Sequence, residues 1–394
     1  MQNKALIDRF LRYVRIDTQS AEDAGRSPST AKQFDLADLL SEELTALGAE
    51  VDYDREFGYV YAKIPGEEPA LGFLSHMDTS PEASGAGVQP RIFTYDGHDA
   101  LLDMETFPEL KNHIGEELIA TDGTTLLGAD DKAGVAEIMN LAAYYHDHPE
   151  ERHRTIAICF TPDEEIGEGT AHFDPARFAA KEAYTVDGGK FGILEYECFN
   201  AAGAKLDFYG KNVHTGSAKN SMVNAILLAM EFQSLLPPAE APEYTEGYEG
   251  FYHSYTMEGD VEHAQIKYLI RDFDKEKFAA RKQYLQNAAD YMKRKYGAER
   301  VSISIADQYY NMREPMKDHM DLIDNAAAIL RELGTEPRTE PIRGGTDGAN
   351  LSFRGIPCPN LSTGGYNFHG RYEYASIPEM EKSAEVLIRL VRIA

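Results

Sequence analysis

Apolar residues recur at helical and strand spacings in turn along the first half of the chain. Leu6, Ile7, Phe10, Leu11 and Val14 lie at helical spacing and predict an amphipathic helix. The predicted elements of this half are helices over about 3–15, 30–47 and 132–146, and strands over about 50–53, 58–64, 70–77, 155–165 and 183–189. Residues 79–120 are rich in Gly and Pro and show little periodicity, which is typical of loops.

Strands that alternate with helices in this way are typical of an α/β fold with a mainly parallel, mixed sheet. In such a sheet, ligands bind in the crevice beyond the carboxyl ends of the strands. We therefore expect the chemistry of this protein to lie just past its predicted strands.

The order of elements changes over residues 204–315. Strands at AKLDFYG, IKYLIRDF and VSISIADQYY alternate with two helices, and a Pro- and Glu-rich loop covers 237–250. This pattern indicates a compact α+β insert. After it come a helix over about 318–334, a loop at PIRGGTDGANLSF, a short strand and a closing helix from about 378. We predict one domain formed by residues 1–203 and 316–394 and a second formed by residues 204–315.

The net charge and the cysteines exclude several classes of function. The chain has 66 acidic and 39 basic residues, a formal charge of −27, so nucleic acids and anionic membranes would repel it. We find no apolar run long enough to span a bilayer and no apolar signal-peptide core. The three cysteines are odd in number and far apart, which is typical of reduced thiols. We expect a cytoplasmic protein that binds neither nucleic acid nor membrane.

Acidic and imidazole side chains follow several of the predicted strands. The stretch LGFLSHMDTSP ends in His76 and Asp78, which point to the same side because strand side chains alternate between faces. The other members of this strand-end set are Asp130 with Asp131, Glu164 with Glu165, Asp187, and His369. Each residue alone has a simpler interpretation as a loop cap or surface acid. Together in one crevice, the acids would repel one another unless cations lay among them.

Two divalent metal ions would supply that charge, and imidazole with carboxylate suits zinc. In two-metal sites a shared carboxylate and a water molecule bridge ions about 3.5–4 Å apart. The sequence contains no HExxH, GxSxG or Walker motif, and no cysteine belongs to the set. Spacing alone does not decide whether Asp130 or Asp131 is the bridge.

Ten motifs along the chain resemble those of the peptidase T family, the tripeptide aminopeptidases of the di-zinc M20 clan. They are HMDT, LLGADDKAG, FTPDEEIG, YTVDGG, NVHTGSAKNSMVNA, EYTEGYEGFYH, IRDFD, YYNMRE, PIRGGTDGANLSF and PCPNLSTGGYNFHG, and they cover nearly the whole chain. The resemblance implies a phosphorylase/hydrolase-like catalytic domain with an inserted lid domain. It also implies tripeptides as substrates.

The resemblance gives the strand-end residues separate roles. It implies that His76 and Asp187 bind one zinc ion, that Glu165 and His369 bind the other, and that Asp130 bridges both. It implies that Asp78 orients the His76 ring and raises its basicity. Glu164 is then the general base, which takes a proton from the zinc-bridging water and passes it to the leaving amine.

Substrate contacts are implied on the predicted lid and its neighbouring loops. His214 in NVHTG resembles a histidine that stabilises the oxyanion or binds substrate, although Thr215 stands where many relatives have proline. Arg271 and Arg343 are candidates for binding the peptide carboxylate, because a guanidinium pairs with it bidentately. We expect Asn350 to shape the rim of the pocket.

Several alternatives share this sequence pattern. Another M20-type dipeptidase, carboxypeptidase or N-acyl amino-acid deacylase would use the same metal ligands. A non-catalytic binding protein on the same fold would lack a ligand or the base, and here none is missing. Cobalt or manganese can replace zinc at such N/O sites. Some clan members pair through their lids, so a homodimer with His214 acting on the partner's site is compatible with the sequence.

Overall fold

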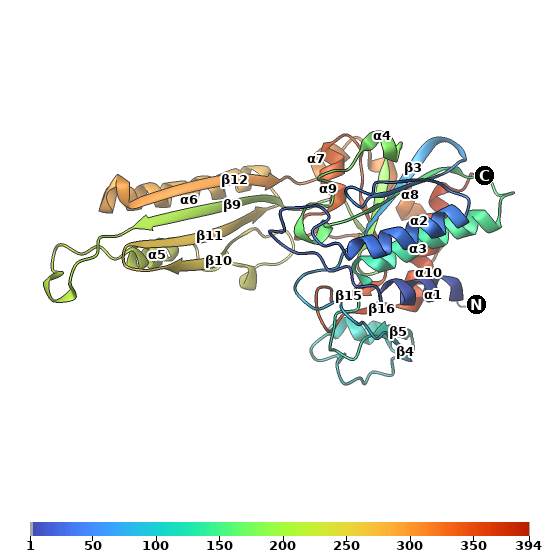
Figure 1. Ribbon diagram of the computed structural model, residues 1–394, viewed down its shortest axis with the longest axis horizontal. Coiled ribbons are helices and arrows are strands. Elements are labelled where there is room, and N and C mark those ends of the chain that lie inside the picture. Colours follow the sequence, from blue (N-terminus) through green and yellow to red (C-terminus); the bar gives the residue numbers. More distant parts are fainter. Residues whose placement is uncertain (1–2, 394) are drawn as a thin grey trace. The chain divides into compact units, whose positions relative to one another are not determined.

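The computed structural model describes residues 3–393, and these form two compact units (Figure 1). Unit 1 contains residues 3–196, 312–340 and 346–393, and unit 2 contains residues 197–311 and 341–345. Compared with the predicted domains, residues 197–203 and 341–345 belong to unit 2 and residues 312–315 to unit 1. Within unit 2, the Ile342 N–H donates to the Glu197 carbonyl at 2.8 Å, and Arg343 donates to the carbonyls of Gly247 and Glu249.

Unit 1 is built on an eight-stranded mixed sheet. In spatial order its strands are β1 (Glu50–Tyr53), β2 (Val60–Ile64), β6 (Arg154–Thr161), β3 (Glu67–His76), β7 (Ala183–Gly188), β14 (Asn360–Ser362), β8 (Ile193–Glu195) and β13 (Arg338–Thr339). The central strands β6, β3, β7 and β14 are parallel to one another, and the β13–β8 pair is also parallel. The β1–β2, β2–β6 and β14–β8 pairs are antiparallel. The predicted α/β fold with a mainly parallel, mixed sheet is confirmed.

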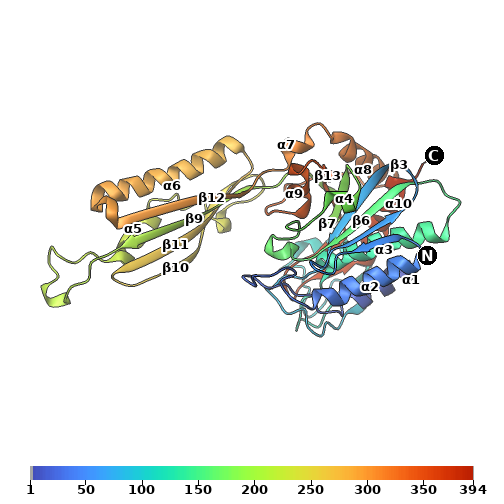
Figure 2. The same ribbon diagram turned by 45° about the horizontal axis from the view of Figure 1, so that its top comes forward.

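Helices cover both faces of this sheet (Figure 2). Helix α3 (Ala129–Asp147) packs on β3 and β7, on the side that carries Ser75, and it contacts α1 (Lys4–Tyr13) and α10 (Ile377–Val391). Leu74 alternates with Ser75 and therefore faces the other side, where it shares a core with α4 (Pro175–Phe178) and α9 (Asp347–Phe353). The other helices of unit 1 are α2 (Gln33–Ala46), α7 (Arg313–Met316) and α8 (Met320–Glu332).

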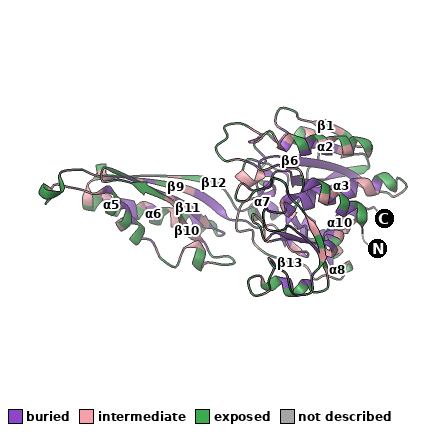
Figure 3. Ribbon diagram, turned by 60° about the horizontal axis from the view of Figure 1, so that its bottom comes forward, coloured by how far each residue is buried: buried purple, intermediate pink, exposed green. Residues whose placement is uncertain are grey.

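Burial on both faces explains the continuous apolar runs of the central strands. Strand β6 and helix α3 are buried along most of their length (Figure 3). In the parallel pair of β3 and β6, His76 lies beside Thr161, so the two strands end level with each other. The residues that follow these ends therefore meet at one edge of the sheet.

A second, four-stranded antiparallel sheet takes two of its strands from residues 79–120, where the sequence showed little periodicity. Its order is β15 (Gly365–Tyr366), β16 (Tyr374–Ser376), β5 (Glu117–Ala120) and β4 (Arg91–Thr94). Residues 367–373 connect β15 to β16 and carry His369.

Unit 2 is a four-stranded antiparallel sheet covered on one face by two helices. The strands are, in spatial order, β10 (Phe251–Gly259), β11 (His263–Asp272), β9 (Asn200–Tyr209) and β12 (Val301–Tyr309). Alternate residues of β9 and β11, such as Leu206 and Ile266, form one core with α5 (Ala225–Ser234) and α6 (Lys275–Tyr296). The predicted α+β character of this segment is therefore confirmed.

Helix α9 and strand β10 also depart from the sequence-based expectation. The stretch predicted as a loop, 341–353, ends in helix α9, because the Thr346 side chain caps it by accepting the Gly348 N–H at 3.2 Å. Strand β10 was not predicted, because this edge strand is largely exposed and lacks a clear apolar alternation. Among residues 3–393, no helix combines the length and apolar character needed to cross a membrane.

Candidate metal centre

His76 lies at the carboxyl end of β3 and is almost fully buried. Its Nε2 atom lies 2.9 Å from Asp130 Oδ1 and 3.4 Å from Asp187 Oδ1. The other ring nitrogen, Nδ1, lies 3.0 Å from the backbone carbonyl of Asp78. One imidazole nitrogen and two carboxylates from three elements thus converge in the first half of the site.

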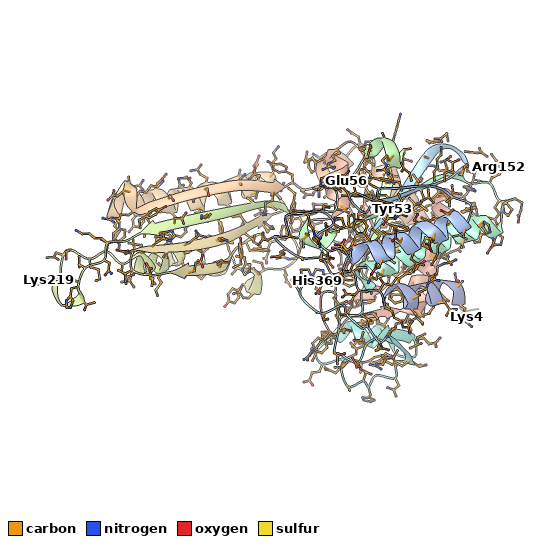
Figure 4. All side chains as sticks on the ribbon, in the orientation of Figure 1. Lys4, Tyr53, Glu56, Arg152, Lys219 and His369 are labelled. Atoms are coloured by element: carbon orange, nitrogen blue, oxygen red, sulfur yellow. The ribbon has the colours of Figure 1, made fainter. Side chains whose placement is uncertain are left out.

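His369 forms the second half of the site, from the loop between β15 and β16 (labelled in Figure 4). Its Nε2 atom lies 2.8 Å from Glu165 Oε2 and 3.2 Å from Asp130 Oδ2. Asp130 therefore presents one carboxylate oxygen to each histidine. This is the arrangement that a carboxylate bridging two cations requires.

Asp131 differs from Asp130 because its oxygens are engaged by the protein. One oxygen accepts the hydroxyl of Ser75 and the backbone N–H of His76, and the other accepts the Gly134 N–H at 3.2 Å. Its oxygens also lie within 4.8 Å of ligand atoms of His76 and Asp187, so these three residues form a further candidate group. Asp130 and Asp131 have non-helical dihedral angles at the start of α3, which turn the two side chains in different directions.

The Asp78 carboxylate organises the acidic pair that follows β6. Its Oδ1 accepts the Glu164 N–H at 3.0 Å, and its Oδ2 accepts the Glu165 N–H at 3.2 Å. The distance from Asp78 Oδ1 to His76 Nδ1 is 3.4 Å, longer than the distance from that nitrogen to the Asp78 carbonyl. The carboxylate thus holds the Glu164–Glu165 turn, in addition to the expected contact with His76.

Asp163, which the strand-end pattern did not select, also anchors the same turn. Its carboxylate accepts the Ser29 N–H at 2.7 Å and the Gln33 side-chain amide at 2.7 Å. The residue is fully buried and has a left-handed φ of 58°, directly before Glu164. Its only sequence signal is a third acid before the EE pair.

Burial opposes ionisation of the acids at this site. It raises the pKa of Glu164 well above the usual value. Burial, followed by the negative charge of Asp130, raises the pKa of Glu165 to about 7. Burial also raises the pKa of Asp187 to about 6. These carboxylates therefore ionise less readily than exposed ones unless positive charge is brought near them.

The neighbouring carboxylates favour the protonated form of the two imidazoles and raise the pKa of both. Burial acts to lower the pKa of His76, but Asp187 and Asp130 raise it well above its usual value. Hydrogen bonds to Asp130 and Glu165 raise the pKa of His369 to about 11. Burial acts to raise the pKa of Asp130, but hydrogen bonds from both histidines hold it well below its usual range.

The donor set fits two divalent cations. The ligand atoms of His76, Asp130 and Glu165 lie within 4.8 Å of one another. Glu165 Oε1 is buried and has no hydrogen-bond partner among the described residues. Imidazole nitrogens and carboxylate oxygens are ligands that zinc accepts.

Two further buried acids, Asp347 and Glu373, lie beside the site and were not among the predicted site residues. Asp347 accepts the Thr161 hydroxyl at 2.8 Å, and burial raises its pKa to about 7. Glu373 accepts three backbone N–H groups at the start of α3. Neither residue follows a predicted strand, so the pattern that selected the other acids did not include them.

The predicted substrate-binding residues lie in both units. His214 is exposed in unit 2, where its Nδ1 accepts the Gly216 N–H at 3.1 Å. Arg271 Nη1 donates to the carbonyls of Ala202 and Ile270. Asn350 belongs to unit 1, where it lies in α9 rather than in the expected loop.

Arg343 also lies in unit 2, and its guanidinium holds a neighbouring turn. It donates to the carbonyls of Gly247 and Glu249 at 2.8 and 3.0 Å and to the Thr245 hydroxyl at 3.0 Å. The group lies 5.1 Å from the centre of the Phe199 ring. Much of its hydrogen-bonding capacity is therefore used within the protein.

A family model described as "Peptidase family M20/M25/M40" matches residues 113–393 of the chain. Among curated proteins, the chain is 51% identical over 406 residues to the peptidase T of Geobacillus sp. (strain WCH70). That alignment covers 100% of this chain and 99% of the relative.

Two solved structures are similar over nearly the whole chain. The aminopeptidase PepT from Bacillus cereus ATCC 10987 has a TM-score of 0.78 at 25% identity, and the alignment covers 98% of this chain and 97% of that one. A tripeptidase from Staphylococcus aureus subsp. aureus mu50 has a TM-score of 0.80 at 22% identity. Here 99% of this chain and 98% of the other are covered.

Proposed function

The chain belongs to peptidase family M20/M25/M40, and we propose that it removes the N-terminal residue from tripeptides at a centre of two zinc ions. The observation that carries this proposal is the position of Asp130, whose two oxygens lie 2.9 Å from His76 Nε2 and 3.2 Å from His369 Nε2. The peptidase T motifs of the sequence and the relative of that name support the choice of tripeptides.

Five side chains would hold the two ions. His76 and Asp187 would bind one, Glu165 and His369 would bind the other, and Asp130 would contribute an oxygen to each. When bound, the ions supply positive charge that offsets the acids, polarises the scissile carbonyl and makes water a better nucleophile. The protein contributes the spacing of the ligands, which comes from the ends of β3, β6 and β7, the start of α3 and the loop that carries His369.

Glu164 is the residue that moves the proton. We assign it the removal of a proton from the attacking water and the transfer of that proton to the leaving amine. Its pKa, which burial raises, makes its carboxylate a stronger base than an exposed glutamate. Asp78 accepts the backbone N–H groups of both Glu164 and Glu165 and so fixes the backbone from which the two side chains extend. The Glu164 side chain is then available to the water, and the Glu165 side chain to the metal.

We also assign four residues to substrate binding. His214 is assigned on the sequence resemblance, Arg271 and Arg343 on the chemistry of the guanidinium group, and Asn350 on its expected place at the rim of the pocket. For the two arginines, the proposed partner is the peptide carboxylate, which a guanidinium pairs with in two parallel hydrogen bonds.

The deciding assay measures turnover of Ala-Ala, Ala-Ala-Ala, Ala-Ala-Ala-Ala and N-acetyl-Ala, with and without a metal chelator. We expect cleavage of the tripeptide from its N-terminus, loss of activity with chelator, and recovery on adding zinc. Equal turnover of all three peptides would remove the tripeptide assignment. Preference for the dipeptide or the acylated amino acid would favour another M20 reaction. Turnover that the chelator does not change would contradict the requirement for metal.

A further inference from the structure

Glu373 connects two segments of the candidate metal centre that are far apart in the sequence. It lies four residues after His369, and its side chain is 1% exposed. Its Oε2 accepts the N–H groups of Leu127 and Gly128, both at 2.7 Å, and its Oε1 accepts the Asp130 N–H at 3.0 Å. One carboxylate therefore binds three backbone donors within four residues of another segment.

The segment that Glu373 binds needs an acceptor from elsewhere. Gly128 is the residue before α3, has a left-handed φ of 82°, and provides no side-chain cap. The first N–H groups of a helix have no partner within the helix, and buried donors without a partner are costly. Glu373 satisfies them across 243–246 positions of sequence.

The same residue also shapes the loop that carries His369. The Glu373 N–H donates to the Gly370 carbonyl at 3.2 Å and closes a turn beside the histidine. Glu373 is thus attached to the His369 segment through its backbone and to the Asp130 segment through its carboxylate. The distance between His369 Nε2 and Asp130 Oδ2, 3.2 Å, depends on how these two segments are held together.

We propose that Glu373 is a positioning residue that fixes the Asp130 segment against the His369 loop and so presets the centre for two cations. This inference rests on the proposed two-metal function. Removing a residue that hydrogen-bonds to the segment carrying a metal ligand typically lowers metal affinity or activity about 10- to 100-fold. Both ions should be affected, because Asp130 faces both halves of the site.

The chemistry of the side chain allows a test that keeps its size. An ionised carboxylate accepts hydrogen bonds on both oxygens, whereas a glutamine accepts on one and donates from the other end. Glu373→Gln must therefore oppose an N–H group of the Asp130 segment with an NH₂ group. Glu373→Asp keeps both acceptors and the charge but shortens the side chain, and we expect partial rescue.

Glu379→Gln is the matched control. Glu379 also accepts a backbone N–H, from Phe191 at 3.0 Å, and the Tyr366 hydroxyl at 2.8 Å. It binds no part of the Asp130 segment, so the same substitution there should leave zinc affinity unchanged.

The experiment uses full-length protein stripped of metal by a chelator. Zinc stoichiometry and affinity are measured by competition with a chromophoric chelator, and thermal unfolding of the metal-free proteins is recorded beside them. We expect two zinc equivalents in the unaltered protein, about 10- to 100-fold weaker binding of both in Glu373→Gln, and an intermediate loss in Glu373→Asp. Affinity of Glu373→Gln equal to that of the unaltered protein would overturn the inference.

Other outcomes separate this inference from the proposed function. Two tightly bound zinc ions without tripeptide cleavage would remove the function but leave the role of Glu373 intact. If metal-free Glu373→Gln is unfolded, Glu373→Asp carries the test, and zinc affinity equal to that of the unaltered protein in a folded Glu373→Asp would overturn the inference. Cleavage of tripeptides without bound zinc would contradict both the two-zinc function and the role of Glu373.

Discussion

The carboxylate of Asp78 accepts a hydrogen bond from the backbone N–H of Glu164, with 3.0 Å between oxygen and nitrogen. Its second oxygen accepts the next N–H, of Glu165, at 3.2 Å. Asp78 is fully buried, so water does not compete for these bonds. It therefore links the strand that carries His76 to the turn that carries the proposed base.

Asp78→Asn should impair catalysis more than metal binding. The asparagine side chain accepts on one oxygen only, so one of the two backbone N–H groups loses its partner and the Glu164–Glu165 turn shifts. We expect kcat/KM for Ala-Ala-Ala to fall about 10- to 100-fold, with zinc still bound. Asp99→Asn is the control, because Asp99 accepts the N–H groups of Leu101 and Leu102 away from the site. Equal activity in Asp78→Asn and the unaltered protein would contradict the role of Asp78.

Replacing Glu164 or Glu165 by alanine should affect different properties, catalysis in the first variant and zinc binding in the second. Glu164→Ala removes the proposed base, and we expect kcat to fall by about 10²- to 10⁴-fold while two zinc ions remain bound. Glu165→Ala removes the carboxylate that lies 2.8 Å from His369 Nε2, and we expect one zinc equivalent to be lost. Metal analysis of the purified variants, beside kinetics, checks both outcomes. The reverse pattern would exchange the two roles.

The order of strands and helices was predictable because it depends on local spacing. The helices at Lys4–Tyr13 and Gln33–Ala46 and the strand ending in His76 are confirmed, since each carries its own apolar pattern. The second sheet was not predictable in this way. Its strands contain two to four residues, and β5 pairs with β16 about 250 positions later.

Only some residues of the site could be predicted from the sequence. Strand alternation selected His76 and Asp78, and the acids after β6 and near the end of β7 followed from the sheet type. The choice between Asp130 and Asp131 depends on the backbone angles at the start of α3, which no spacing rule provides. Asp163 and Glu373 bind backbone N–H groups more than 100 positions away, so nothing near them in the sequence reveals their partners.

Asp163→Asn should lower the stability of the protein. Its buried carboxylate accepts the Ser29 N–H on both oxygens and the Gln33 amide on Oδ1, and an asparagine in either orientation would place an NH₂ group against the Ser29 N–H. We expect the free energy of unfolding, measured by urea denaturation, to fall by about 1–3 kcal/mol. Asp122→Asn is the control, because exposed Asp122 accepts the Thr124 N–H within its own turn. A loss no larger than that of the control would contradict the anchoring role.

The stability of the metal-free protein should fall as the pH rises from 6 to 8. The pKa of Glu165 is raised to about 7 and that of His369 to about 11, so in this range the folded state holds more protons than the unfolded state. Each additional proton held by the folded state lowers the free energy of unfolding by about 1.4 kcal/mol for every unit that the pH rises. Zinc requires deprotonated ligands, so loading should reduce or reverse this slope. Thermal unfolding of chelator-treated and zinc-loaded protein across this range checks the sign. Glu165→Gln should flatten the metal-free slope, and a metal-free protein that gains stability toward pH 8 would contradict the charge balance described for the centre.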